Sequence, residues 1–193
     1  MNKTAKNSTN AADRLVAADI SQLLVVDIQE RLAPATAEPE SVIRQAGNLL
    51  RAARILGVPH TVSEQYPKGL GGTVGQVADL ADPDRIFDKL HFSCQADDRL
   101  AAQVAALDRP LVVVCGMEAH VCVLQTVLEL LDARYRVSVV GDAVTSRTIS
   151  NRDLALDRMR RAGADIVSTE MVLFEWLRTA GHPEFRDVSA LIK

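Results

Sequence analysis

The sequence has few aromatic residues and lacks an apolar run long enough to cross a membrane. Aromatic side chains make up 4% of its 193 residues, whereas hydrophobic residues as a whole make up 48%. Such an aliphatic composition is typical of a folded globular domain. Its longest apolar run, residues 111–114, has the length of a strand, far below the roughly 20 residues of a transmembrane helix. We therefore expect no membrane partner.

Basic residues are not in excess either. The chain has 22 Lys and Arg against 25 Asp and Glu, so its formal net charge is −3 at pH 7. Without a basic run, a nucleic-acid partner is not expected. The first 18 residues are polar and lack the apolar core of a signal peptide. We interpret residues 1–18 as a flexible N-terminal tail and residues 19–193 as one domain, located in the cytoplasm.

Cysteine is scarce. The three cysteines, Cys94, Cys115 and Cys122, form no CxxC pair, and an odd number without a secretion signal argues against a disulfide framework. Two interpretations follow: the cysteines are small buried hydrophobic residues, or one of them is a nucleophile. Cys115 lies inside an apolar run and is expected in the core, whereas the role of Cys94 stays open.

Apolar segments of strand length alternate with segments of helical period, the pattern of βαβ units. Continuous apolar runs at residues 23–26 and 111–114 indicate strands that are buried on both faces. The sequence therefore predicts an α/β domain with a parallel sheet. The predicted strands are residues 22–28, 58–63, 85–88, 110–115, 136–141 and 164–168. The predicted helices are residues 39–56, 97–107, 121–131, 150–162, 169–179 and 183–192.

One helix start follows a buried strand and carries a cysteine. Gly116 and a short turn separate the strand at 110–115 from the helix on which Cys122 lies. Free N–H groups and the dipole at a helix start lower the pKa of a thiol and favour the thiolate, and such N–H groups also bind an oxyanion. The layout is similar to the strand–turn–helix elbow of serine hydrolases, so Cys122 is a candidate nucleophile.

Two more polar residues end predicted strands. Asp27 ends the first strand and Lys89 follows the third. Alone, Asp27 is compatible with a helix cap or an ordinary ion pair, and Lys89 with a solvated surface position. Ligands of open parallel sheets bind at the carboxyl ends of the strands, where Asp27, Lys89 and Cys122 can meet as general base, cation and nucleophile. By position, the candidates for lining a substrate pocket are Gln29, Leu32, Gln65, Tyr66 and His120. Residues 66–72 are either a moving lid or a fixed surface crossing.

Three segments carry a family resemblance. Residues 24–29 (LVVDIQ), 89–93 (KLHFS) and 116–123 (GMEAHVCV) resemble the three signature blocks of the isochorismatase-like cysteine hydrolases, and residues 142–147 resemble a later block of that family. The similarity covers residues 21–177. It implies a three-layer α/β/α fold, with a Rossmann-like six-stranded parallel sheet that has helices on both faces, and a homo-oligomer.

The resemblance also implies an active site. It assigns Asp27, Lys89 and Cys122 to a catalytic triad, a non-proline cis peptide to the Met117–Glu118 bond, and an oxyanion hole to the N–H groups of Glu118 and Cys122. The implied activity is hydrolysis of an amide or related C–N bond in a small molecule, through a thioester on Cys122.

Departures from the family pattern narrow this expectation. Nicotinamidases of the family bind a metal through an Asp-x-His motif, which is absent from residues 60–65 (HTVSEQ), so we expect no metal and no cofactor. True isochorismatases lack the nucleophilic cysteine that is present here. Two alternatives stay open: a non-catalytic binding module on the same fold, and a thiol redox sensor in which Cys94 is the partner of Cys122.

Overall fold

The structure, a computed structural model, describes residues 14–193. Residues 1–13 of the predicted tail lie outside the described part. Residues 14–18 of the predicted tail are described. Among them, the Val16 side chain is buried and the Val16 N–H donates to Glu175 Oε2 at 2.6 Å. A short 3-10 helix, η2 (Ala18–Ile20), then leads into the first strand. The chain therefore packs against the domain from Val16 onward.

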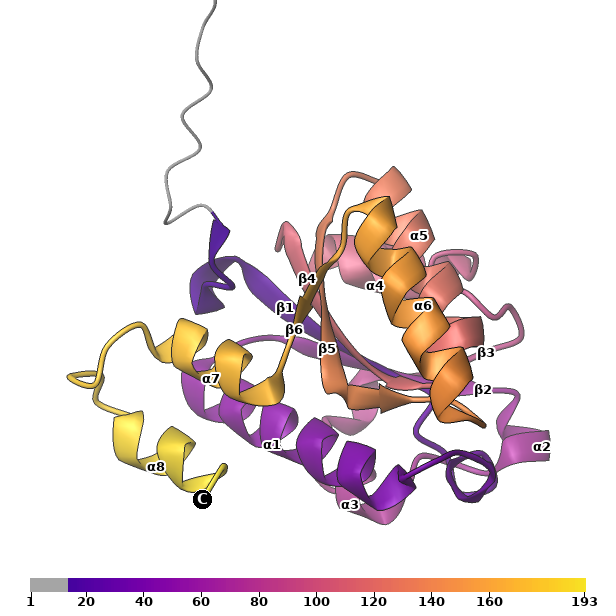
Figure 1. Cartoon of the computed structure of the whole chain (residues 1–193), viewed down its shortest axis with the longest axis horizontal. Coiled ribbons are helices and arrows are strands. Elements are labelled where there is room, and N and C mark those ends of the chain that lie inside the picture. Colours follow the sequence, from indigo (N-terminus) through magenta and orange to yellow (C-terminus); the bar gives the residue numbers. More distant parts are fainter. Residues whose placement is uncertain (1–13) are drawn as a thin grey trace, which may run out of the picture.

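Six parallel strands form one sheet in the order β3-β2-β1-β4-β5-β6 (Figure 1). The strands are β1 (Ser21–Val26), β2 (His60–Gln65), β3 (Ile86–Lys89), β4 (Leu111–Met117), β5 (Arg136–Thr145) and β6 (Asp165–Val167). The strand order reverses between β1 and β4, which is where open α/β sheets bind their ligands. The predicted six-stranded parallel sheet is confirmed.

Helices cover both faces of the sheet (Figure 1). On one face lie α1 (Pro39–Leu56), α3 (Gly75–Ala78), α7 (Thr169–Leu177) and α8 (Phe185–Ala190), and on the other lie α4 (Asp98–Ala106), α5 (Leu124–Asp132) and α6 (Ile149–Ala162). The short elements between them are η3 (Ala33–Ala35), α2 (Pro67–Leu70), η4 (Pro83–Arg85) and the π-helical turn η5 (Ala119–Val123). The predicted three-layer α/β/α architecture is confirmed.

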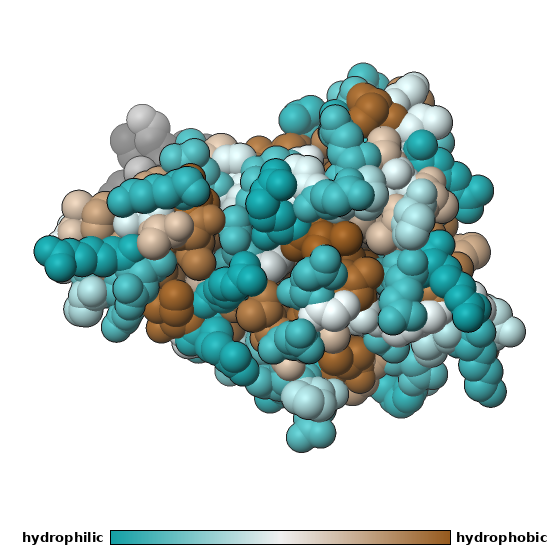
Figure 2. Space-filling model, turned by 90° about the horizontal axis from the view of Figure 1, so that it is seen from below, coloured by the Kyte–Doolittle hydropathy of each residue, from teal (hydrophilic) through white to brown (hydrophobic). Residues whose placement is uncertain are grey.

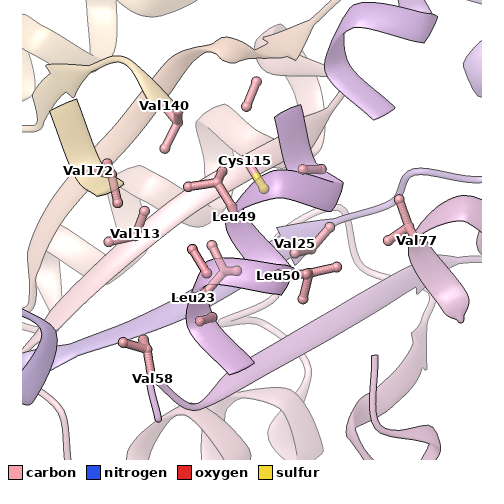
Figure 3. Packing of buried hydrophobic residues seen from close by; sticks show 14 of the residues in the cluster. Leu23, Val25, Leu49, Leu50, Val58, Val77, Val113, Cys115, Val140 and Val172 are labelled. Atoms are coloured by element: carbon pink, nitrogen blue, oxygen red, sulfur yellow. The ribbon is translucent and has the colours of Figure 1, made fainter. Parts of the chain in front are cut away.

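Side chains of β1 alternate between two cores. Leu23 and Val25 pack with Leu49 of α1 in one core (Figure 3), whereas Leu24 and Val26 belong to the core on the opposite face. These five side chains are at most 1% exposed. Successive residues of a strand point to opposite faces, so an unbroken apolar run fits a strand that is covered twice. Each buried leucine contributes roughly 1.5–3 kcal/mol.

An irregularity in the pairing of β4 with β5 lies close to the carboxyl edge. Val114 pairs with Val139, but Gly116 pairs with Val144, so Cys115 alone faces residues 140–143 of β5. The extra residues shift the register of the rest of β5. As a result Thr145 pairs with Met117, and the segment after Thr145 begins beside the chain that leads to Cys122.

Gly116 is required by a close approach of two strands. Its φ of +125° lies in the region that favours glycine, and a Cβ at this position would overlap the carbonyl group of Val26. We expect Gly116→Ala to lower the free energy of unfolding by about 3 kcal/mol or more, measured by urea denaturation. Gly75→Ala is the matched control, because nothing lies within 4 Å of its Cβ position. Equal stability of the two variants would contradict the close approach.

Among the helices of residues 14–193, none has both the length and the apolar character needed to span a bilayer. Figure 2 shows one face of the molecule, on which hydrophilic residues surround small hydrophobic areas.

Candidate active site

Asp27 and Lys89 form a buried ion pair above the carboxyl edge of the sheet. Asp27 follows β1 and Lys89 ends β3, so β2 lies between them. Their strands are therefore about 9–10 Å apart, a gap that the long lysine side chain crosses. Lys89 Nζ donates to Asp27 Oδ2 at 2.7 Å, and neither side chain is exposed to solvent. The pairing expected from strand topology is present.

The intervening strand β2 supplies a partner for each member of this pair. Ser63 Oγ donates to Asp27 Oδ1 at 2.7 Å, and Gln65 Oε1 accepts from Lys89 Nζ at 2.8 Å. Ser63 and Gln65 are two residues apart, so their side chains share one face of the strand. Buried charges are tolerated when their hydrogen-bonding capacity is used, and β2 meets that need.

The backbone of Asp27 is unusual. Its φ is +51°, in the left-handed region that few residues other than glycine adopt. Aspartate tolerates this conformation better than most residues do. The Asp27 N–H still donates to the carbonyl oxygen of Ser63 at 3.0 Å. The chain therefore leaves the sheet directly after Asp27, and the carboxylate stays over β2.

Cys122 lies in the turn between β4 and α5. The Met117–Glu118 peptide bond is cis, as the family resemblance implies. The carbonyl oxygen of Glu118 then accepts the N–H groups of Val121 and Val123 at 3.1 and 3.2 Å, which closes the π-helical turn η5. Turns of this type are frequent at functional sites. Cys122 lies inside η5 and is 5% exposed. The α-helix predicted to start at residue 121 starts at Leu124 instead, and the π-helical turn η5 precedes it.

The resting charge of Cys122 differs from the sequence-based expectation. Burial raises the pKa of the Cys122 thiol most, and the negative charge of Asp27 and a hydrogen bond with Asp27 raise it further. Lys89 lowers this pKa but does not reverse the shift. This upward shift runs against the low-pKa thiolate that the sequence predicts, because burial and the neighbouring carboxylate both disfavour the thiolate. The raised pKa favours a thiol at rest.

Lys89 keeps its charge in this buried position. Burial is the largest single influence and lowers the pKa of Lys89, but Asp27, Cys94 and Cys122 together raise it by more, so the net shift is upward. The ammonium, the carboxylate and the neutral thiol together carry no net charge. Asp27 can therefore accept the proton of the Cys122 thiol when a substrate is bound, and no proton has to leave the site.

A raised pKa predicts how Cys122 reacts with alkylating reagents. Only the thiolate is nucleophilic, and its fraction rises about tenfold per pH unit below the pKa. We expect the rate of Cys122 alkylation by iodoacetamide to rise throughout pH 6–9 without a plateau, as measured by intact-protein mass spectrometry. Cys122→Ala identifies the site of the adduct. A plateau near pH 7 would show that the thiolate is already formed at rest.

Two of the predicted pocket residues, Gln29 and Gln65, use their side chains for hydrogen bonds within the protein. Gln29 Oε1 accepts the N–H of Gln65 at 2.8 Å, and Gln29 Nε2 donates to the carbonyl oxygens of Gln65 and Gly71 at 3.0 and 2.7 Å. The Gln65 side chain is bonded to Lys89 and to the carbonyl oxygen of Leu90. Both glutamines are buried, and their side chains are bonded within the protein; their place in a substrate pocket stays a prediction.

The other three pocket candidates differ in exposure. Leu32 is buried at 8% exposure, Tyr66 is 50% exposed, and His120 is partly buried with Nδ1 at 3.0 Å from Ser146 Oγ. Tyr66 is joined to the end of β3 because its N–H donates to the carbonyl oxygen of Lys89 at 2.9 Å. Lining of a pocket by these three residues stays a prediction.

Hydrogen bonds attach residues 66–72 to neighbouring segments along their length. The segment contains α2, and the N–H groups of Glu30 and Arg31 donate to the carbonyl oxygens of Gly72 and Leu70 at 3.0 and 2.9 Å. Thr73, directly after the segment, donates through its N–H and its hydroxyl to Glu64. This bonding favours the interpretation of a fixed surface crossing over that of a moving lid.

The remaining cysteines and Glu118 have supporting positions. Cys115 lies in the core, as expected. Cys94 is fully buried, its Sγ donates to Ser63 Oγ at 3.5 Å, and burial raises the pKa of its thiol to about 11. Arg147 Nε donates to Glu118 Oε1 at 3.1 Å. Because Arg147 is 68% exposed, solvent screens this ion pair.

No metal site can be assembled from the described part of the chain. Within residues 14–193, no group of three or more His, Cys, Asp and Glu side chains is placed to hold a metal ion.

Comparisons with known proteins now identify the family. Residues 21–171 match the model of the isochorismatase domain. The chain belongs to the isochorismatase domain family. It is 43% identical over 179 residues to "Secreted isochorismatase effector Isc1" of Phytophthora sojae, covering 90% of this chain and 84% of that protein. It is 41% identical to the zebrafish isochorismatase domain-containing protein 1, but spans only 59% of that relative's length.

Solved structures agree with this assignment. "MAR1 Ribonuclease" from Caenorhabditis elegans superposes with a TM-score of 0.86 at 37% identity and 91% coverage of each chain. The Escherichia coli YcaC protein, described as an octameric hydrolase of unknown specificity, superposes with a TM-score of 0.82 at 20% identity, covering 92% and 95% of the two chains. The isochorismatase-like hydrolase fold is therefore shown for this chain.

Proposed function

We propose that this family member is a cysteine hydrolase that cleaves an amide or related C–N bond in a small molecule. Cys122 is the nucleophile, Asp27 the general base and Lys89 the cation that balances their charges. One observation carries the proposal: the buried Asp27 carboxylate bonds to Lys89 Nζ at 2.7 Å, and both groups lie close enough to Cys122 to shift the pKa of its thiol. A thiol beside a buried base is the arrangement that nucleophilic catalysis requires.

The first half of the proposed cycle forms a thioester. Asp27 takes the proton of the Cys122 thiol, and the sulfur attacks the carbonyl carbon of the substrate. The N–H groups of Glu118 and Cys122 bind the oxygen that becomes negative, while Lys89 offsets the charge of the thiolate. Asp27 then returns the proton to the nitrogen, the C–N bond breaks, and ammonia or an amine leaves.

The second half regenerates the thiol. Asp27 takes a proton from a water molecule, the resulting hydroxide attacks the thioester, and the C–S bond breaks. The departing sulfur regains the proton from Asp27, and a carboxylic acid is released. Each cycle consumes one water molecule and returns the thiol and the carboxylate to their starting states.

The test is a search for turnover that depends on Cys122. Small amides, ureas and carbamoyl compounds are screened for ammonia release with the wild type, Cys122→Ala and, as a control outside the site, Cys115→Ala. We expect turnover that Cys122→Ala lowers about 1,000-fold or more and that Cys115→Ala retains. If no compound turns over while peroxide links Cys122 to Cys94, the redox-sensor alternative replaces the hydrolase.

A ribonuclease activity is less consistent with this chain. The related Caenorhabditis elegans structure carries the name MAR1 ribonuclease, but here the net charge is −3 and Cys122 is 5% exposed. RNA binding depends mainly on basic groups that contact phosphates. An RNA oligonucleotide belongs in the same screen, and its Cys122-dependent cleavage would change the substrate class. A binding module without catalysis does not account for the presence of Asp27, Lys89 and Cys122 together.

Assembly and location complete the proposal. We propose a homo-oligomer, in line with the description of YcaC as octameric, and light scattering on the purified chain tests its mass. We propose the cytoplasm as its location, because its three cysteines are free and free thiols suit a reducing compartment. Fractionation of cells and medium tests the location, since one relative is named a secreted effector.

A further inference from the structure

The side-chain amide of Gln65 is fixed at both ends. Its Oε1 accepts from Lys89 Nζ at 2.8 Å, and its Nε2 donates to the carbonyl oxygen of Leu90 at 2.9 Å. An amide that donates at one end and accepts at the other has only one orientation that satisfies both contacts. Gln65 is 8% exposed, so water cannot readily replace either partner.

The backbone of Gln65 is fixed as well. Gln29 bonds to both the N–H and the carbonyl oxygen of Gln65, at 2.8 and 3.0 Å. Gln29 in turn donates to Gly71, which ties it to the crossing segment. Hydrogen bonds to the backbone and to the side-chain Nε2 of Gln65 therefore fix the position of Oε1, the atom that accepts from Lys89, before any substrate binds.

The Lys89 ammonium has three N–H donors, and partners within residues 14–193 use two of them. One donates to Asp27 Oδ2 at 2.7 Å and one to Gln65 Oε1 at 2.8 Å. With these two directions fixed, tetrahedral geometry fixes the third. Removal of the Gln65 acceptor would let the ammonium rotate about its contact with Asp27.

We infer that Gln65 is a positioning residue, whose side-chain carbonyl holds the Lys89 ammonium so that its third N–H is available to the sulfur of Cys122 when the thiolate forms. The inference rests on the proposed function and gives Gln65 a different task from pocket lining. The neutrality of Gln65 matters too, because a carboxylate in its place would oppose the charge on the thiolate. The role requires an acceptor without charge at this position.

The test measures Cys122 alkylation by iodoacetamide, which needs no substrate. Gln65→Met removes the acceptor and keeps the bulk, whereas Gln65→Glu keeps the shape and adds charge. We expect both variants to alkylate about tenfold more slowly than the wild type at pH 8, because each makes the thiolate harder to form. Gln65→Asn, whose acceptor is retracted by one methylene, should give an intermediate rate and is the second variant if Gln65→Met does not fold.

Gln22→Met is the matched control. Gln22 is also a buried glutamine, and its Nε2 donates to the carbonyl oxygens of Val104 and Arg109 at 3.1 and 2.9 Å, at the opposite end of β1. It should lower Tm without changing the rate of alkylation at any pH from 6 to 9. The inference is overturned if the Gln65 variants alkylate at the wild-type rate, or if Gln22→Met slows alkylation equally. Where turnover is found, kcat should fall in the Gln65 variants with KM unchanged; absence of turnover in the wild type counts against the proposed function alone.

Discussion

Replacement of Asp27 by asparagine is expected to abolish turnover and, at the same time, to make Cys122 more reactive toward iodoacetamide near neutral pH. The carboxylate acts as the base in the proposed cycle, so its loss should lower kcat/KM by about 10²–10⁴. The same carboxylate raises the pKa of the Cys122 thiol, through its charge and its hydrogen bond, whereas Lys89 lowers that pKa. Without the negative charge, the ammonium favours the thiolate.

Asparagine suits this test because it tolerates the left-handed backbone of Asp27, whose φ is +51°. We expect alkylation at pH 7 to be about tenfold faster than in the wild type, which corresponds to a pKa lower by about one unit. Asp142→Asn is the control: Asp142 lies inside β5, and its carboxylate bonds to Thr169 at the start of α7. If turnover and alkylation fall together in Asp27→Asn, the carboxylate only maintains the structure.

The second large effect concerns stability. Lys89→Met leaves the Asp27 carboxylate buried without its counter-ion, and the loss of one partner of a buried ion pair costs about 3–5 kcal/mol. In the double variant Asp27→Asn/Lys89→Met no charge stays unpaired, so most of that loss should be recovered while turnover stays absent. Urea denaturation of the two single variants and the double variant gives the coupling energy.

Lys68→Met provides the reference for this comparison, because Lys68 is exposed on the surface crossing and its replacement should change the unfolding free energy by less than about 0.5 kcal/mol. If the double variant loses as much stability as the sum of the two single variants, Asp27 and Lys89 are not coupled. That result would contradict the buried pair as the centre of the site.

Much of this arrangement could be predicted from the order of residue types along the chain. Apolar runs place the strands, and parallel strands bring their carboxyl ends to one edge, so Asp27, Lys89 and Cys122 converge for topological reasons. The pKa of Cys122 could not be predicted in the same way. Its sign depends on how deeply the thiol is buried and on how close Asp27 and Lys89 lie, and these are distances across the sheet that sequence spacing does not contain.

The supporting residues were missed or misassigned for a related reason. Strand β2 was expected to end at Ser63, because Glu64 and Gln65 are polar, yet it runs to Gln65. These polar residues belong to the strand and serve the site, so a criterion based on apolar runs ends the strand too early. The role of Ser63 went unnoticed for lack of any signal beyond a small hydroxyl residue near a strand end. Strand β5, expected at 136–141, likewise runs on to Thr145.

The extra length of β5 has a consequence for how insertions and deletions in this family are read. One residue of β4, Cys115, is matched by residues 140–143 of β5. A deletion within residues 140–143 that restored one-to-one pairing with β4 would move Ser146 and Arg147 along the strand. They would then leave the positions in which they contact His120 and Glu118. Gaps at 140–143 in an alignment of relatives would therefore mark lineages with an altered substrate side, even though the deleted residues lie inside a strand and touch no catalytic group.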